Sequence, residues 1–264
     1  MVNLLPLIQD HLPLFLVILI RVGGILVAIP AIGSRTVPLQ VRIALVVGLT
    51  VILFPVVSDH VRPSGTSFPQ ILPLLFTEFM IGMVLGFAIR FVMVAFEIAG
   101  ELIGVQMGIN LIGALDPVGS SGSVPIVGQF MGLLGMLVFL AIDGHHMMFE
   151  ALVASFQLVP PLQVHFSGRL VETILTLAVG MFVLALKVGA PVMTALFIVT
   201  LGMGILGRSI PQLNVMLNNV PITIGVGLLV LGLTLPLFGT IAESNLRGLG
   251  PTLQGLLSLM GPAR

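Results

Sequence analysis

The sequence has no cysteine, tryptophan or tyrosine, and very few charged residues. The absence of cysteine excludes disulfide bonds and thiolate metal sites. Only 8% of the 264 residues are charged, whereas a soluble domain carries roughly 25% because its surface must face water. With 57% hydrophobic residues and a mean hydropathy of +1.22, the chain is predicted to be an all-α, polytopic helical membrane protein.

The charges that are present do not form a nucleic-acid site. Ten basic and ten acidic residues give a net charge of zero, and the basic residues are scattered along the chain. Tryptophan and tyrosine usually anchor membrane helices at the lipid headgroups. Their absence has two interpretations, which are compositional drift and an apolar surface that faces other subunits instead of lipid.

A membrane span requires roughly 20 apolar residues, and by this criterion the sequence contains about six apolar segments. They cover residues 12–32, 41–57, 71–95, 126–142, 170–206 and 220–238, and polar turns are predicted at 33–40, 58–70, 143–169 and 208–219. The fifth segment is longer than one crossing requires, and Pro191 lies inside it. Because proline removes a backbone donor and crowds the preceding turn, a kinked or broken helix is predicted there.

Glycines recur at the four-residue spacing that lets membrane helices approach closely. Gly82 and Gly86 form one such pair. The others flank a polar stretch in the middle of the chain, and they are Gly100, Gly104 and Gly108 before it and Gly128 and Gly132 after it. Tight helix–helix contacts are therefore predicted at these glycines.

Three charged residues, Arg90, Glu97 and Glu101, share one helix face, because they are seven and four residues apart. Ionisable groups at membrane depth normally face a bundle interior or a water-filled cavity. Two interpretations are open. Arg90 and Glu97 neutralise each other as a structural pair, or the three side chains form a polar stripe on the wall of a conduit.

The helix that carries this stripe is predicted to end in the sequence LDPVGSSGSVP. Pro117 disfavours helix at Asp116, and the Gly/Ser run that follows leaves backbone groups without partners inside the helix. Irregular backbone at membrane depth is tolerated only inside protein or beside water. The segment is therefore either a buried loop or an ordinary loop outside the bilayer.

Two further groups of polar residues have alternative interpretations. Asp143, His146 and Glu150, with His145 adjacent, could ligate a metal on a helix, but a capped polar helix start at a membrane boundary is the preferred interpretation. Lys187 could snorkel, take part in transport, or pair with a carboxylate from Glu172 or from a partner subunit. No catalytic triad, phosphate loop or dinucleotide fingerprint is present, so neither an enzyme nor a cofactor is predicted.

Four longer motifs follow one another along the chain. The first two are RVGGILVAIPAIGSRTVPLQVRIAL and the Gly/Gln-rich AGELIGVQMGINLIGALDP. The third is IDGHHMMFEALVASFQLVPP. The fourth is ALKVGAPVMTALFIVTLGMGILGRSIPQLNVM, which ends in a turn marked by Arg208, Pro211, Gln212 and Asn214. In this order the motifs resemble the FliR family of flagellar and type III secretion export-gate proteins over nearly the whole chain.

The resemblance implies a hetero-oligomeric export gate in the bacterial inner membrane, within the flagellar basal body. Its partners would be FliP-like, FliQ-like, FlhB-like and FlhA-like subunits, membrane lipid and unfolded secreted polypeptides, with no nucleic acid, metal or cofactor. Residues 1–165 would correspond to a FliP-like part, and residues 166–264 to a FliQ-like helical hairpin.

The resemblance also implies that a loop of this chain helps to plug the closed pore. The matching segment is 106–123, and its candidate plug residues are Gln106, Met107, Asn110, Asp116, Pro117, Gly119, Ser120, Ser121 and Gly122. From the residues alone, two other functions stay open. One is a stand-alone secondary transporter that uses Lys187, Glu97 and Glu101 as coupling residues, and the other is a purely structural membrane scaffold.

Overall fold

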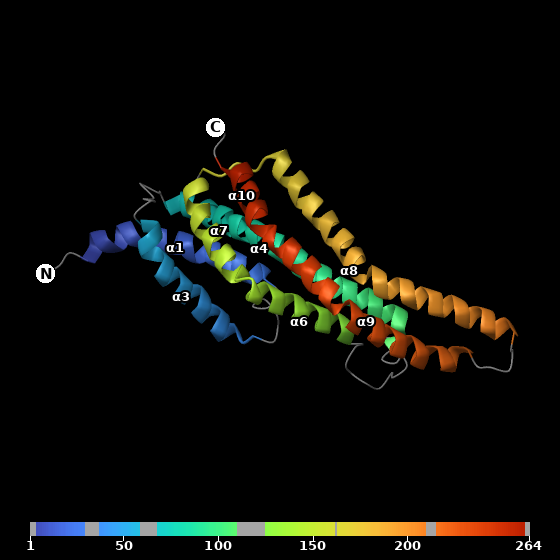
Figure 1. Ribbon diagram of the computed structural model, residues 1–264. Coiled ribbons are helices and arrows are strands. Elements are labelled where there is room, and N and C mark those ends of the chain that lie inside the picture. The colour runs from blue at the N-terminus through green and yellow to red at the C-terminus, as the bar shows by residue number, and fades with distance from the viewer. Residues whose placement is uncertain are drawn as a thin grey trace. The chain divides into compact units, whose positions relative to one another are not determined.

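The computed structural model describes residues 4–29, 37–58, 68–109, 125–161, 163–209 and 215–261. In these ranges the helices are α1 (Leu4–Ala28), α3 (Leu39–Ser58), α4 (Phe68–Met107), α6 (Ile126–Ala141), α7 (Gly144–Leu158), α8 (Gly168–Ser209), α9 (Val215–Arg247) and α10 (Leu249–Met260) (Figure 1). The described residues contain no strand. The prediction of an all-α protein is therefore confirmed.

Four helical stretches in the described part of the chain are long and apolar enough to cross a membrane. They cover Leu39–Ser58, Ile71–Met107, Gly168–Ser209 and Asn219–Met260. The helices α6 and α7, which meet at an angle of 69°, make a fifth stretch if they form one bent span. The first predicted segment lies on α1, whose apolar part, Leu12–Ala28, is shorter. Each of the six predicted segments thus lies on a helix in the part of the chain that the structure describes, which confirms the polytopic membrane architecture.

Two details of the sequence prediction are wrong. The predicted turn at residues 143–169 contains α7, a helix of 15 residues whose buried positions, including Met148, Leu152 and Ser155, recur at helical spacing. Of the two alternatives predicted at Pro191, the broken helix is wrong, because α8 continues through this proline as one helix of 42 residues, whereas the kink stays a prediction. Proline removes a single backbone hydrogen bond, and in apolar surroundings the other amides of the helix have no alternative partners.

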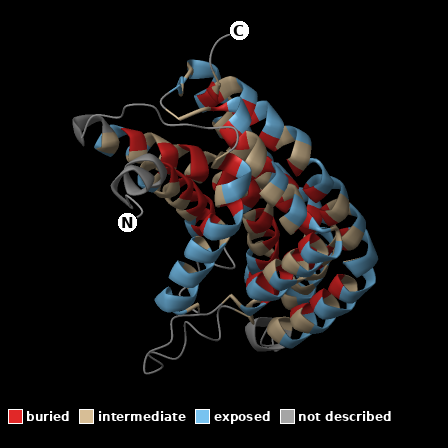
Figure 2. Cartoon of the chain, turned by 90° about the vertical axis from the view of Figure 1, so that its left-hand side faces the viewer, coloured by how far each residue is buried: buried red, intermediate tan, exposed pale blue. Residues whose placement is uncertain are grey.

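The chain divides into two compact units, each built from separate stretches of sequence. Unit 1 comprises Met1–Phe91, Asp143–Ala178 and Arg247–Arg264, and unit 2 comprises Val92–Ile142 and Val179–Leu246. Each unit is described by itself below. On the helices, buried residues alternate with exposed ones (Figure 2), and many of the exposed side chains are large and apolar, as Leu72 and Leu233 are.

In unit 1, glycines bring α1 and α4 into backbone contact. A Cβ atom on Gly24 would lie 2.7 Å from the carbonyl oxygen of Phe79 and 3.1 Å from the Cα of Gly82. A Cβ atom on Gly82 would collide with the carbonyl oxygen of Arg21, and one on Gly86 would lie 2.8 Å from the carbonyl oxygen of Ile25. The predicted close approach at Gly82 and Gly86 is therefore confirmed, and the partner helix is α1.

The rest of unit 1 is an apolar core to which the C-terminal helix contributes. Helix α10 packs against α7, and α3 packs against α1 and α7. The buried side chains of α10 occupy one helical face, and they are Leu249, Leu253, Leu256, Leu257 and Met260. The backbone amide of His165 also donates a hydrogen bond to the carbonyl oxygen of Met260, over 3.1 Å. The end of α10 is thus attached to the segment that follows α7.

Candidate functional site

In unit 2, helices α4 and α6 touch through glycine. A Cβ atom on Gly100 would lie 2.5 Å from the carbonyl oxygen of Val127 and 2.7 Å from the Cα of Gly128. Both neighbours are backbone atoms, which cannot move aside without displacing the helix. Gly104 is also buried on α4. The two glycine series that flank the polar stretch of the sequence thus come together where α4 crosses α6.

The same glycines accommodate the two carboxylate side chains of α4. The Cγ of Glu101 would lie 2.8 Å from a Cβ atom on Gly128, and the Cγ of Glu97 would lie 2.7 Å from a Cβ atom on Gly132. A larger residue in place of Gly128 or Gly132 would therefore displace these side chains. The aliphatic parts of the two glutamates run over the bare backbone of α6, and Glu101 remains exposed to the surroundings of the chain.

Arg90, the third member of the predicted polar stripe, interacts with a different helix. In unit 1, its Nη1 donates a hydrogen bond over 3.4 Å to the carbonyl oxygen of Ala28, the last residue of α1. A cation at a helix C-terminus satisfies a carbonyl that has no partner within the helix. The positions of Arg90 and Glu97 are two helical turns apart along α4, about 10.5 Å. Their interpretation as a mutually neutralising pair stays a prediction.

Helix α4 ends at Met107, earlier than the sequence predicts. Gly108 follows with φ of 78°, a left-handed conformation that favours glycine, and its amide donates a hydrogen bond to the carbonyl oxygen of Val105 over 3.1 Å. Gly108 therefore terminates the helix. A Cβ atom added to Gly108 would lie 3.6 Å from the side chain of Val220 on α9, and the predicted role of Gly108 at a helix–helix contact stays a prediction.

The end of α4 is attached to α9 in unit 2. The hydroxyl of Thr223 lies 2.9 Å from the carbonyl oxygen of Met107 and can donate to it, and the side chain of Met107 is fully buried against Gly227. Gln106, in contrast, is exposed. The other candidate plug residues lie outside the described residues, and they are Asn110, Asp116, Pro117, Gly119, Ser120, Ser121 and Gly122.

We expect Thr223→Val to destabilise the chain by about 1 kcal/mol, because the carbonyl oxygen of Met107 loses its donor while the side-chain shape is kept. The measurement is reversible unfolding of the purified chain in detergent. Thr240→Val is the matched control, because Thr240 is exposed and bonds only within α9. Equal effects of the two substitutions would contradict an attachment through Thr223.

A cavity of about 440 Å³ opens beside the end of α4 in unit 2. Its lining includes Gln106 and Gly108 from α4 and the following turn, Phe197 from α8, and Asn219 from α9. The Oδ1 atom of Asn219 is buried and has no hydrogen-bond partner among the described residues. The cavity thus combines apolar walls with an amide group whose hydrogen-bonding capacity is incompletely used.

The most buried charged group of the described residues lies in unit 1, and the sequence analysis did not identify it. Arg21 of α1 and Glu78 of α4 are both fully buried, and the Nε of Arg21 donates to the Oε2 of Glu78 over 2.6 Å. Arg21 also donates to the hydroxyl of Ser155 over 3.0 Å and to the carbonyl oxygen of Val159 over 3.1 Å. Its guanidinium lies 4.1 Å from the centre of the Phe156 ring. This cluster connects α1, α4 and α7.

A signal for this cluster was present in the sequence. Arg21 stands alone in its apolar segment, Glu78 shares its own only with Arg90, and isolated charges at membrane depth usually pair with one another. The two residues are 57 positions apart, however, and nothing local in the sequence indicates which charge meets which.

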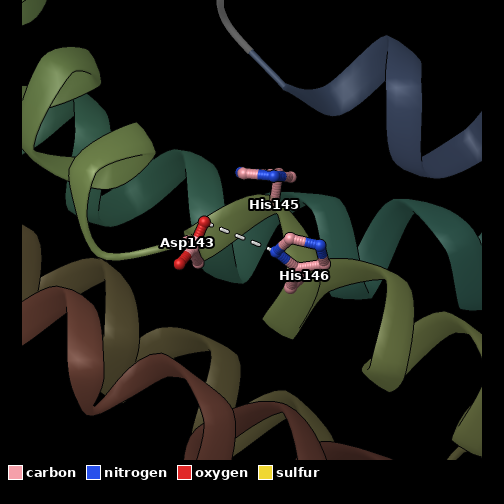
Figure 3. Close-up of side chains that lie close together, drawn as sticks. All are labelled: Asp143, His145 and His146. Carbon is pink, nitrogen blue, oxygen red and sulfur yellow. Dashed lines mark ion pairs between the residues drawn. The ribbon is translucent and has the colours of Figure 1, made fainter.

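Asp143, His145 and His146 lie close together at the start of α7 (Figure 3). One potential ligand atom from each lies within 4.8 Å of the others, so the three could hold a metal ion after small side-chain rotations. The Oδ1 of Asp143 is 3.5 Å from the Nδ1 of His146, and these side chains are 71% and 67% exposed. Glu150, which the sequence suggested as a third ligand, is not part of this group.

The preferred interpretation of this segment, a capped helix start, is wrong in its chemistry. Asp143 occupies the N-cap position with φ of 58°, but its side chain makes no capping hydrogen bond. The backbone carbonyl of Asp143 accepts from the amide of His146 over 2.8 Å. The carboxylate of Asp143 instead lies 3.5 Å from the Nδ1 of His146.

The remaining predicted residues lie on α8 and the turn after it. Lys187 is exposed, and it makes no ion pair or hydrogen bond with the part of the chain that the structure describes. Glu172 precedes it by fifteen residues on the same continuous helix, about 22 Å away, so the predicted pairing of these two residues is wrong. Arg208 is exposed in the last turn of α8, and Pro211, Gln212 and Asn214 lie outside the described residues.

These features define a polytopic helical membrane protein with polar groups at helix contacts. The family of bacterial export proteins, family 1, matches residues 12–249. The flagellar biosynthetic protein FliR of Bacillus subtilis (strain 168) is 31% identical over 257 residues, which cover 96% of this chain and 98% of that protein. FliR of Pectobacterium carotovorum subsp. carotovorum and FliR of Escherichia coli (strain K12) are 31% and 29% identical, each with 85% of both chains covered. The chain therefore belongs to the FliR family of bacterial export proteins, which confirms the resemblance.

Proposed function

We propose that this chain is a subunit of a flagellar type III export gate in the bacterial inner membrane. There it helps to form and to close the channel through which unfolded flagellar proteins pass. Family membership supports this proposal, since the similar proteins are flagellar biosynthetic proteins and one of them is matched over 98% of its length. The proposed partners are FliP-like, FliQ-like, FlhB-like and FlhA-like subunits. Residues 1–165 are assigned to the FliP-like part and residues 166–264 to the FliQ-like hairpin, which includes α8 and α9.

The geometry at the end of α4 is the observation that supports a plug most directly. The helix stops at Gly108, at the start of segment 106–123, and Thr223 attaches its last carbonyl to α9. A segment that plugs a pore needs a fixed anchor on one side and backbone that can be displaced at low cost on the other. The Gly/Ser composition of residues 119–123 meets the second requirement.

In the proposed mechanism the chain conducts polypeptide and performs no covalent chemistry. Segment 106–123 and apolar side chains of neighbouring subunits obstruct the resting pore and limit ion leak. An arriving unfolded substrate displaces the segment, with energy from an associated ATPase and the proton motive force. The exposed carboxylate of Glu101 and the exposed Gln106 are assigned to surfaces that contact water or protein, because charged and polar groups at membrane depth avoid lipid.

We expect deletion of residues 118–123 to increase ion leak in resting cells several-fold, because the resting pore loses its obstruction. The measurement is the membrane conductance of cells that carry the assembled gate, together with flagellar protein export. Deletion of residues 62–67, six residues between α3 and α4, is the length-matched control. An unchanged leak with normal export would count against the plug and would leave a scaffold as the better function.

A further inference from the structure

Lys187 is a charged residue in the middle of the longest apolar helix. Between Glu172 and Arg208 it is the only charged residue of the sequence. It lies nineteen residues after the start of α8 and twenty-two before its end, which places it roughly 28 and 33 Å from the two ends of the helix. Since a bilayer's hydrocarbon core is about 30 Å thick, a lysine at this position cannot reach water by extending along its own helix.

The helix face around Lys187 is exposed and apolar. It is termed the Lys187 face, and it consists of Val179, Phe182, Val183, Leu186, Lys187 and Ala190, which are all exposed and recur at helical spacing. Phe182 and Leu186, the largest of these apolar side chains, are 57% and 53% exposed. Gly180, on the same helix, has no atom within 4 Å of an added Cβ. No element of unit 2 among the described residues covers this face.

The described part of the chain contains no counter-ion for this lysine. The carboxylate stems of Glu97 and Glu101 lie over Gly132 and Gly128 of α6, and Glu172 is fifteen residues away along α8. An unpaired ammonium group facing lipid is strongly disfavoured, and charged residues within membrane helices pair with one another or line water-filled space. The surrounding apolar side chains argue against a water-filled surface and for a protein surface that carries the opposite charge.

We propose that the Lys187 face docks against a membrane helix of another export-gate subunit that carries an aspartate or glutamate, and that Lys187 pairs with this carboxylate. This inference rests on the proposed function, because it requires an assembly of several subunits. The apolar side chains supply the packed surface, and the charged pair fixes the register between the two helices. Two alternatives to a partner subunit on the Lys187 face are a ring of lipid and a second copy of this chain.

The test is assembly of the complete gate with Lys187 variants. The tagged chain is expressed together with the other export subunits and purified in a mild detergent, and the co-purified subunits are quantified. Lys187→Met keeps the length of the side chain and removes the charge, so the partner carboxylate is left buried without its counter-ion. We expect at least about a tenfold loss of co-purified subunits. Lys187→Arg keeps the charge and should retain most of the complex, and Leu186→Met is the neutral control on the same face.

Because Lys187 makes no contact within the described part of its own chain, Lys187→Met should leave the membrane level and protease resistance of the chain unchanged. Assembly of Lys187→Met at the wild-type level would overturn the inference. A photo-crosslinking residue at Ala190 gives a second readout that does not depend on stability. Crosslinks to another subunit support the docking, whereas crosslinks only to lipid or to a second copy of this chain overturn it. If the proposed function itself is wrong, the wild-type chain purifies without any export subunit.

Discussion

Arg21→Met is expected to lower the free energy of unfolding of the chain by about 3–5 kcal/mol, because removal of one partner leaves Glu78 buried without its counter-ion. The substitution also leaves the hydroxyl of Ser155 and the carbonyl oxygen of Val159 without their donor. Since Arg21 of α1 connects groups on α4 and at α7, the loss should affect all of unit 1. The measurement is unfolding of the purified chain in detergent, together with its steady-state level in the membrane.

Two further variants separate the loss of the ion pair from a general loss of packing. The double variant Arg21→Met with Glu78→Met removes both charges, and we expect it to recover a large part of the stability lost by the single variant. Arg169→Met changes an exposed arginine and should remain within about 0.5 kcal/mol of the wild type. A double variant that is as unstable as the sum of both single variants would contradict a coupled pair.

Gly100→Ala is expected to destabilise the chain by about 1–3 kcal/mol, and Gly100→Leu by more, since the new Cβ atom would lie 2.5 Å from the carbonyl oxygen of Val127. The backbones of α4 and α6 would have to separate. The side chains of Glu97 and Glu101 would then lose their packing against Gly132 and Gly128. The measurement is the same unfolding experiment, with recovery of the assembled complex as a second readout.

Gly180→Ala is the control for this prediction, and its effect should have the opposite sign. An added Cβ at Gly180 has no atom within 4 Å, and alanine is more favourable than glycine in a helix interior by about 1 kcal/mol. Gly100→Ala should therefore lower stability while Gly180→Ala raises it slightly. If both substitutions stabilise the chain, α4 and α6 do not approach as closely as the structure has them.

Hydropathy predicted the helices well, because a chain that spans a membrane must satisfy its backbone within apolar segments. A helix start was predicted at Asp143, but the length of α7 was missed, because its first turn carries Asp143, His145 and His146 and the region was interpreted as a polar turn. At Pro191 only the alternative of a broken helix was wrong, because α8 continues through this residue. Proline indicates the loss of one hydrogen bond, but the apolar surroundings determine whether the helix continues.

Residue spacing predicted that helices approach closely, but it could not identify their partners. Gly82 packs against α1 and Gly100 packs against α6, although both belong to the same kind of glycine series in α4. Gly108 has the same spacing, yet its role is a positive φ angle that ends the helix. The pairing of Arg21 with Glu78 depends on tertiary contacts between distant segments, so it becomes visible only when α1, α4 and α7 are placed together.

The construction of unit 1 from three separated stretches of sequence has a consequence for biosynthesis. The buried face of α10 completes a core whose other helices are made much earlier, so this unit cannot mature until the last of these residues has left the ribosome. Until then, the membrane insertion machinery or a chaperone must shield the apolar surface of α7. A nonsense codon shortly before residue 249 would therefore act as a severe lesion, although it would spare α8 and nearly all of α9.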